Sequence, residues 1–368
     1  MKIGILTFQH SINYGAQLQC LALQKVIQNL GHEVEVIQYY PRKLQPFYRN
    51  VNVPKNGICK GMLYMILRLC YMQKLICKFQ KFKHQYIKLS SPYLSKKNLA
   101  SSAENYDAII VGSDQVWGPG FHSSKEFFFG WEPPYKGKRI SYAPCCAINY
   151  IKEPYKKEVA SLLQQFIAIS VRNKTTQNFV YDLTHINAPI VLDPTFLYDF
   201  SCFKKEEKVY PKPYILTYIL GDEIPGGHKH MIEEIKKVYG DISVVSIHLV
   251  ESCPHKYRWS DKSIYTADPE EWLSYIKNAT FFYTDSFHGV VFALKYRKHF
   301  LAYYAESLRA SRFIDLAELF KINSFIVTSV NDAIQRDSLH QSVNYDAYDS
   351  IMEREVKKSM DYLYKSLS

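Results

Sequence analysis

Apolar and polar positions follow one another along the chain in the patterns of alternating strands and helices. Residues 2–8 form a short apolar run, and residues 33–38 alternate polar with apolar side chains, which are patterns typical of β-strands. Between them, residues 13–30 carry apolar side chains at helical spacing and are followed by Gly31, so they predict an α-helix. A strand, a helix and a second strand form a β-α-β unit, and such units build parallel sheets.

Four further strands are expected before residue 200. Each is a short apolar run that ends in a polar residue or a small loop, as strands do in α/β proteins with sites at their strand ends. They lie at residues 106–112, 139–143, 166–171 and 190–193. The charged stretch at residues 204–208 is interpreted as a linker to a second block of the same kind.

The second block repeats the pattern of strands and helices. Strands are expected at residues 214–219, 242–247 and 280–284, and helices near residues 227–239, 290–294 and 343–366. Another helix is expected to start at Asp268, which is a suitable N-cap before Pro269 and has Glu271 in place to complete a capping box. We therefore predict an α/β protein with two Rossmann-like domains whose parallel sheets face a cleft. The predicted domains are residues 1–200 and 201–340, and a C-terminal helix within residues 341–368 packs back on the first.

Length and composition agree with two folded domains. A chain of 368 residues exceeds one ordinary domain, and 47% hydrophobic with 22% charged residues is typical of a soluble globular protein. The N-terminal residues lack the long apolar stretch of a signal peptide, so we expect a cytoplasmic protein. The eight cysteines include no C-x-x-C pair and no Cys/His cluster at zinc spacing, so we expect free thiols and no metal.

Positive charge is concentrated in one segment, a basic insert at residues 41–103. The whole chain has a net charge of +11, and this insert alone contains 13 Lys and Arg residues and no Asp or Glu. Its apolar stretch is interrupted by Arg68, Lys74 and Lys78, and therefore falls short of the roughly 20 apolar residues of a membrane-spanning helix. Two interpretations stay open: a basic amphipathic helix that lies peripherally on an anionic membrane, or a helix packed on its own domain with a solvated basic face. Nucleic acid is not expected as a partner, because the charge adjoins no recognisable binding module.

Three loops carry candidate chemistry, each with a purely structural alternative. Asn13, Gly15 and Gln17 stand at a helix start that either binds an anion or is simply capped. The run Gly112-Ser113-Asp114-Gln115-Val116-Trp117 suits sugar hydroxyls and a sugar's apolar face, or forms a turn beside a core Trp.

The loop Thr284-Asp285-Ser286-Phe287-His288-Gly289 is the sharpest signal. His288 can exchange a proton near neutral pH with Asp285 orienting it, or else Asp285 and Ser286 cap a helix beside a buried His. Arg172, Arg309 and Arg312 are candidates for clamping carboxylate or phosphate. The sequence contains no G-x-S-x-G elbow, P-loop or H-E-x-x-H motif.

Taken in order, these segments resemble the polysaccharide pyruvyl transferase family, from the N-terminus to about residue 316. The segments that carry the resemblance are Asn13-Tyr14-Gly15-Ala16 with Leu18-Gln19, Gly112 to Trp117, Ser141-Tyr142-Ala143, Ser170-Val171-Arg172, Leu192-Asp193-Pro194-Thr195 and Thr284 to Gly289. The resemblance implies a GT-B-like two-domain fold. It also implies transfer of pyruvate from phosphoenolpyruvate to two hydroxyls of one sugar, on a cell-surface polysaccharide (exopolysaccharide) or lipid-linked oligosaccharide precursor, without a cofactor or metal.

The family match also implies roles for individual residues. The catalytic residues would be His288 as general acid/base, with Asp285 and Asp114. Arg172 would bind phosphoenolpyruvate. The other expected substrate-binding residues are Asn13, Gly15, Gln17, Ser113, Gln115, Trp117, Tyr142, Ser286, Arg309 and Arg312.

Two positions depart from the family pattern. Ser286 stands where some active relatives carry Arg, so an anion contact is expected from Arg309 or Arg312 instead. Residues 144–146 read Pro-Cys-Cys where relatives tend to have small residues and Ser. The alternatives are therefore a GT-B glycosyltransferase that uses a nucleotide sugar and a non-catalytic sugar-binding relative.

Overall fold

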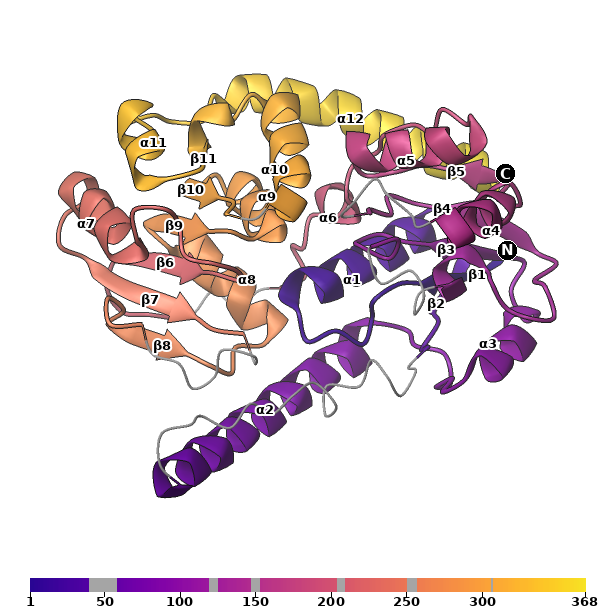
Figure 1. Cartoon of the computed structure of the whole chain (residues 1–368), viewed down its shortest axis with the longest axis horizontal. Helices are drawn as coiled ribbons and strands as arrows, with labels where there is room; N and C mark the ends of the chain where they lie inside the picture. The colour runs from indigo at the N-terminus through magenta and orange to yellow at the C-terminus, as the bar shows by residue number, and fades with distance from the viewer. Residues whose placement is uncertain (40–57, 119–124, 147–152, 204–208, 250–256, 306) are drawn as a thin grey trace.

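The structure is a computed structural model that describes residues 1–39, 58–118, 125–146, 153–203, 209–249, 257–305 and 307–368, with the backbone alone for residues 58–65, 153–154 and 307–309. The expected linker at residues 204–208 lies outside the described residues. Residues 41–57 of the basic insert also lie outside them. Two α/β layers stand side by side, and a helix at the C-terminus runs across both (Figure 1).

The N-terminal sheet has five strands in the order β2-β1-β3-β4-β5, and all of them run parallel. The strands are β1 (Lys2–Leu6), β2 (Glu33–Val36), β3 (Ala108–Val111), β4 (Lys138–Ser141) and β5 (Ala168–Ile169). The prediction of a strand at residues 190–193 is wrong. Ile190 makes only an isolated bridge with Val171, because Asp193 already turns the chain into the next helix as its N-cap.

The C-terminal sheet has six parallel strands in the order β11-β10-β9-β6-β7-β8. They are β6 (Tyr214–Tyr218), β7 (Ser243–Ile247), β8 (Lys262–Ile264), β9 (Phe281–Thr284), β10 (His299–Tyr303) and β11 (Ile326–Val327). The central strands β6 and β9 are buried along their whole length, as expected for parallel strands with both faces covered. Two parallel sheets in an α/β protein confirm the predicted fold class.

Helices cover both sheets. They are α1 (Tyr14–Asn29), α2 (Ile58–Tyr86), α3 (Lys96–Ala103), α4 (Glu153–Leu163), α5 (Lys174–Thr184), α6 (Pro194–Leu197), α7 (His228–Tyr239), α8 (Pro269–Asn278), α9 (Phe287–Lys295), α10 (Ser307–Phe320), α11 (Val330–Gln335) and α12 (Tyr345–Leu367). The predicted capping box at α8 is confirmed, since Asp268 accepts from the Glu271 backbone N–H and Glu271 accepts from that of Asp268. In the part of the chain that is described, no helix is both long and apolar enough to cross a membrane.

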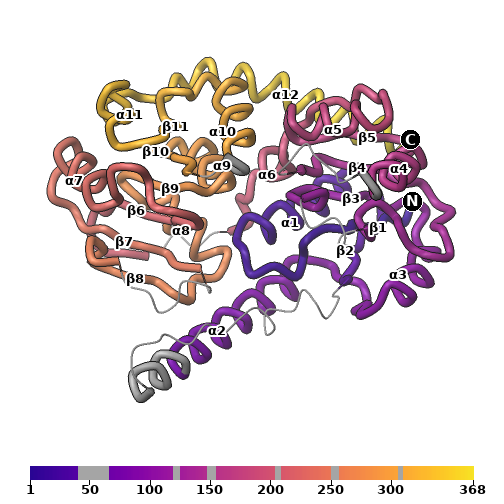
Figure 2. Tube along the Cα trace, viewed as in Figure 1, coloured from indigo at the N-terminus to yellow at the C-terminus, as the bar shows by residue number. Residues whose placement is uncertain are grey.

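Apolar contacts join the two sheets into one body. Tyr14, at the start of α1, stacks on Trp272 of α8 with ring centroids 5.3 Å apart and donates a hydrogen bond to the Ala267 carbonyl. Helix α12 packs on α10 at one end and, at the other, donates from the Tyr362 hydroxyl to the Ser141 carbonyl at the end of β4. Figure 2 shows this helix passing over both parts of the molecule. The two sheets are therefore joined at two places.

His228 predicts how the C-terminal domain responds to acid. Burial lowers the pKa of His228 to about 4, although nearby Glu223 acts in the opposite direction, and His228 Nδ1 lies 3.0 Å from the Tyr283 hydroxyl. The folded state therefore binds fewer protons than the unfolded state between about pH 6.5 and pH 4, and stability falls as the pH drops through that window. We expect His228→Gln to remove up to about 3 kcal/mol of this pH dependence in urea unfolding. The same substitution at exposed His230 should leave the pH dependence of the free energy of unfolding unchanged. An equal pH dependence in both variants would contradict the assignment of this effect to His228.

Candidate active site

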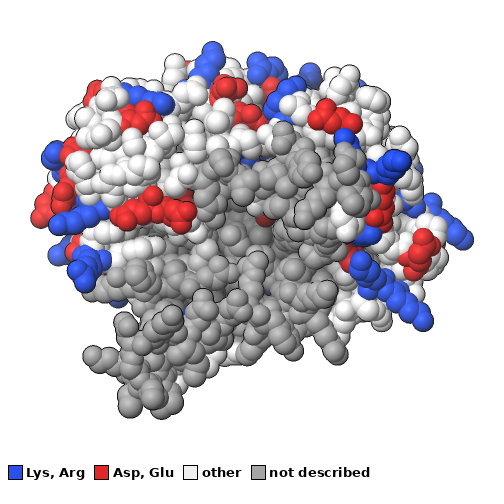
Figure 3. Space-filling view, in the orientation of Figure 1, with Lys and Arg blue, Asp and Glu red and all other residues white. Residues whose placement is uncertain are grey.

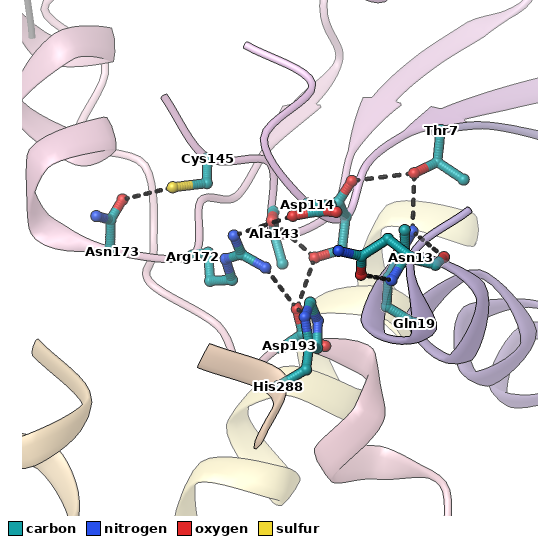
Figure 4. A network of polar contacts seen from close by, with 12 residues as sticks. Thr7, Asn13, Gln19, Asp114, Ala143, Cys145, Arg172, Asn173, Asp193 and His288 are labelled. Carbon is teal, nitrogen blue, oxygen red and sulfur yellow. Dashed lines mark hydrogen bonds and ion pairs between the residues drawn. The ribbon is translucent and has the colours of Figure 1, made fainter. Parts of the chain in front are cut away.

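Three ionisable side chains from distant segments meet at the carboxyl ends of the strands (Figure 4). Arg172 follows β5, Asp193 caps α6, and His288 stands in the first turn of α9. One Arg172 terminal nitrogen lies 2.7 Å from Asp193 Oδ2, and His288 Nε2 lies 3.5 Å from the same oxygen. The carboxyl ends of parallel strands are where α/β proteins place their sites, and here both domains contribute.

Asp193 is the centre of this group. Its side chain is fully buried, and its two oxygens accept hydrogen bonds from Ser113 Oγ at 3.1 Å and from the Thr195 hydroxyl at 2.7 Å, besides Arg172. Burial alone would raise the pKa of Asp193, but His288, Arg172 and the Thr195 hydrogen bond together hold that pKa well below its usual range. Asp193 is therefore a carboxylate at neutral pH.

Asp193, rather than Asp285, is the carboxylate next to His288. The two oxygens of Asp285 accept from the backbone N–H groups of Leu220 and Gly221, at 2.6 and 2.7 Å. The expectation that Asp285 orients His288 therefore needs correction, because this carboxylate is held by the loop after β6. In the sequence, Asp193 stands out only as the Asp that precedes Pro194 in the segment Leu192-Asp193-Pro194-Thr195.

His288 is packed directly on Gly15 of α1. A Cβ atom at position 15 would lie 2.1 Å from His288 Nδ1, which is far inside van der Waals contact. The imidazole is 8% exposed, and within the described residues its Nε2 has no hydrogen-bond partner of good geometry. Gly15 thus acts by permitting close approach, and Nε2 is the ring nitrogen turned toward Asp193.

Replacing Gly15 with Ala tests this contact. Gly to Ala inside a helix normally stabilises a protein by about 1 kcal/mol. Here we expect the opposite, a lower melting temperature together with at least about 100-fold lower activity, because the methyl group must displace the imidazole. Thermal unfolding and turnover of the variant check both effects, and a stabilised, fully active Gly15→Ala protein would show that the ring does not need this position.

Arg172 also borders a cavity of about 600 Å³. Its guanidinium lies over the Phe287 ring, 4.7 Å from the centroid, and 3.4 Å from Asp114 Oδ1. Asp114 adopts a left-handed backbone conformation with φ 71°, which Asp tolerates better than most residues. The cavity is lined by apolar and charged residues, namely Arg172, Asn173, Lys174, Ile190, Val191, Leu192, Asp193, Phe196, Phe287, Arg312, Asp315, Leu316, Glu318, Leu319, Glu355 and Lys358. Its wall therefore combines apolar side chains with both cationic and acidic ones.

Several expected site residues have structural roles instead. Trp117 does not shape a cleft, because its indole N–H donates to the Phe127 carbonyl and its ring stacks in the core on Phe128. Tyr142 is likewise a core residue whose hydroxyl donates to the Leu192 carbonyl. Both side chains are held by apolar packing, Tyr142 in the core cluster that joins the two sheets and Trp117 in a separate cluster of the N-terminal part.

The loop residues mostly follow the capping alternative. Asn13 accepts from the Ala16 N–H and Ser286 from the Gly289 N–H, as N-caps. Gln17 donates to two carbonyls of the preceding loop, and Ser113 joins the network through Asp193. Gln115 is partly buried in the turn after β3, and the side chain of Arg309 lies outside the described residues.

The described residues contain no cluster of three or more His, Cys, Asp or Glu placed to hold a metal. Cys145, one of the two cysteines that depart from the family pattern, lies 3.7 Å from Asn173 Oδ1, beside Arg172 (Figure 4). The site thus consists of a buried arginine, a buried carboxylate and an imidazole.

Comparison with solved structures defines the class of fold. UDP-GlcNAc 2-epimerase from Neisseria meningitidis, bound to UDP-GlcNAc, is 10% identical, with 100% of this chain and 99% of that chain covered and a TM-score of 0.53. S. aureus MnaA with UDP is 14% identical, with coverages of 98% and 96% and a TM-score of 0.53. At such identities the likeness shows the fold alone. The protein has the two-domain GT-B-type fold, as predicted.

Sequence comparison then identifies the family. The family described as "Polysaccharide pyruvyl transferase" matches residues 13–307, which is most of the chain. The chain therefore belongs to the polysaccharide pyruvyl transferase family and is a transferase by that membership. No curated protein matches it. The resemblance drawn from the loop motifs is confirmed.

Proposed function

We propose that the protein transfers pyruvate from phosphoenolpyruvate to two hydroxyls of one sugar in a cell-surface polysaccharide or its lipid-linked precursor. The product is a cyclic ketal, and inorganic phosphate is released. The observation that carries this proposal is the meeting of Arg172, Asp193 and His288 at the strand ends, within a chain of this family.

The reaction needs one proton moved to carbon and two carbon–oxygen bonds formed. Protonation of the phosphoenolpyruvate methylene carbon makes its C2 electrophilic, and the first sugar hydroxyl attacks there. Phosphate leaves C2 and the second hydroxyl attacks, so one hydroxyl proton ends on the new methyl group and the other on phosphate. We assign His288 to these proton transfers, because its Nε2 is buried beside a carboxylate that stabilises the protonated ring.

The donor requires cations for its phosphate and carboxylate. Arg172 and Arg312 both line the 600 Å³ cavity, and the guanidinium fork suits either group. Arg312 supplies a candidate for the anion contact that relatives obtain from Arg at position 286, where this chain has a helix-capping Ser. We place phosphoenolpyruvate at this end of the cavity, next to Asp193 and His288, with no metal in the proposed chemistry.

A phosphate-release assay tests the proposal. The protein is mixed with phosphoenolpyruvate and acceptors that end in Gal, Glc, GlcNAc or ManNAc, and melting temperature is measured with phosphoenolpyruvate and with UDP. We expect acceptor-dependent phosphate release and a thermal shift with phosphoenolpyruvate. A shift with UDP alone, and no release with any acceptor, would favour a glycosyltransferase that uses a nucleotide sugar. Binding of a saccharide without any turnover would favour a sugar-binding relative.

A further inference from the structure

Helix α2 is held on the body along only part of its length. Leu75, Phe79 and Phe82 form a buried stripe at helical spacing, and Lys78 forms an ion pair of 2.7 Å with Glu271 of α8. Tyr71, near the middle of the helix, also packs on Tyr265 with ring centroids 5.0 Å apart, and Figure 1 shows the part of α2 before this residue projecting from the body. The packed half thus fixes the direction of the projecting half.

The outward face of α2 combines exposed apolar and cationic side chains. Ile66, Leu67 and Leu69 are 52%, 41% and 42% exposed, and they lie within one turn of helix. Lys74 and Lys81 are exposed along the same side of the helix. In the rest of the described chain, large exposed apolar side chains occur singly or far apart in sequence. The three neighbouring side chains on α2 therefore form an exposed apolar patch.

The charge of this segment lacks the balance seen elsewhere. Acidic and basic residues are interspersed over the visible face of the two domains (Figure 3). Residues 41–103, by contrast, contain 13 cations and no acid. Within α2, Lys78 is neutralised by its ion pair with Glu271. A complementary partner must therefore be anionic and must also accept aliphatic side chains.

We propose that the outward face of α2 docks on the surface of an anionic lipid bilayer. Lys74 and Lys81 would meet lipid phosphates while Ile66, Leu67 and Leu69 enter the boundary between headgroups and acyl chains. Nucleic acid offers the negative charge but no apolar layer for three aliphatic side chains. Docking itself does not depend on the donor. Its use, which is to hold the enzyme beside a membrane-anchored acceptor, rests on the proposed function.

Vesicle flotation of the full chain tests the docking. The vesicles contain phosphatidylcholine alone or with phosphatidylglycerol. Lys74→Glu with Lys81→Glu is expected to weaken partitioning into the anionic vesicles by about tenfold or more, and Ile66→Ser with Leu69→Ser to weaken it severalfold. Lys157→Glu with Lys357→Glu makes the same change of net charge at exposed positions of α4 and α12 and should have little effect.

The outcomes separate the alternatives. Equal partitioning of the wild type into neutral and anionic vesicles, or equal losses in the α2 and control pairs, would overturn the proposal. Binding to a single-stranded RNA oligonucleotide, without binding to vesicles, would also overturn the proposal. Phosphate release with a water-soluble acceptor should be unchanged in the Lys74→Glu, Lys81→Glu protein, because neither residue borders the site. Normal flotation without any release would leave docking standing and remove the proposed function.

Discussion

His288→Gln is expected to lower kcat for phosphate release from phosphoenolpyruvate by about 10²- to 10⁴-fold, the range that a positioned acid or base contributes. Gln fills similar space and offers an amide near the position of Nε2, but it cannot carry a proton between carbon, hydroxyl and phosphate. Because the loss is confined to proton transfer, phosphoenolpyruvate should still raise the melting temperature of the variant. The pair of measurements therefore separates chemistry from binding.

A histidine outside the site provides the control. His299 begins β10, at the opposite end of the sheet from the loop that carries His288, and it is exposed. His299→Gln should retain full activity. If His288→Gln keeps more than about a tenth of wild-type kcat, another group must supply the proton, and the assignment of His288 would be withdrawn.

The sheets were predictable because parallel strands leave an unambiguous pattern. The runs at β1, β3, β6 and β9 are apolar on both faces, and the Asp268 capping box marks its helix from four residues alone. The pattern did not predict β8, β10 or β11. Two of these are edge strands that are very short, with three residues in β8 and two in β11. Strand β10 is internal and buried after its first residue, so exposure does not explain its omission.

The site was only partly predictable, because its decisive contacts join residues far apart in sequence. The loops that contain His288 and Arg172 were found from residue type and position after strands. The carboxylate next to the His288 imidazole is Asp193 and not Asp285. This contact depends on how the two domains meet, since Asp193 and His288 belong to different domains. Trp117 shows the opposite outcome. A Trp after a strand gives the same sequence pattern whether its indole contacts a ligand or packs in the core, so the pattern could not predict its buried position.

Removing Asp193 is expected to destabilise the protein by about 3–5 kcal/mol, the usual effect of leaving a buried charge without its partner. Arg172 is 3% exposed, and without Asp193 its closest remaining carboxylate is Asp114 at 3.4 Å. Asp193→Asn keeps the shape, and its amide oxygen can keep the Thr195 contact, but an NH2 group replaces Oδ2, which accepts from Arg172 and Ser113. The variant therefore measures the loss of the charge together with those two hydrogen bonds. Urea unfolding at neutral pH measures it.

An exposed pair of equal length provides the comparison. Arg297 and Asp349 also lie 2.7 Å apart, but both side chains are about half exposed. Asp349→Asn should therefore cost no more than about 1 kcal/mol. Similar losses in the two variants would mean that burial of Arg172 does not make its ion pair stronger.

The double variant Arg172→Leu with Asp193→Leu decides whether the pair exists for stability or for function. Breaking one partner leaves an uncompensated charge, whereas replacing both by apolar side chains removes the desolvation penalty as well, and such replacements are often neutral or stabilising. We expect the double variant to unfold at higher urea than Asp193→Asn but to show no thermal shift with phosphoenolpyruvate. Since the pKa of Asp193 is held below its usual range, its charge contributes fully to the free energy of unfolding above about pH 4. That contribution is lost only as the pH falls further. A double variant less stable than Asp193→Asn would indicate that the ion pair is retained for the fold. The case for Arg172 as the donor's anchor would then rest on binding measurements alone.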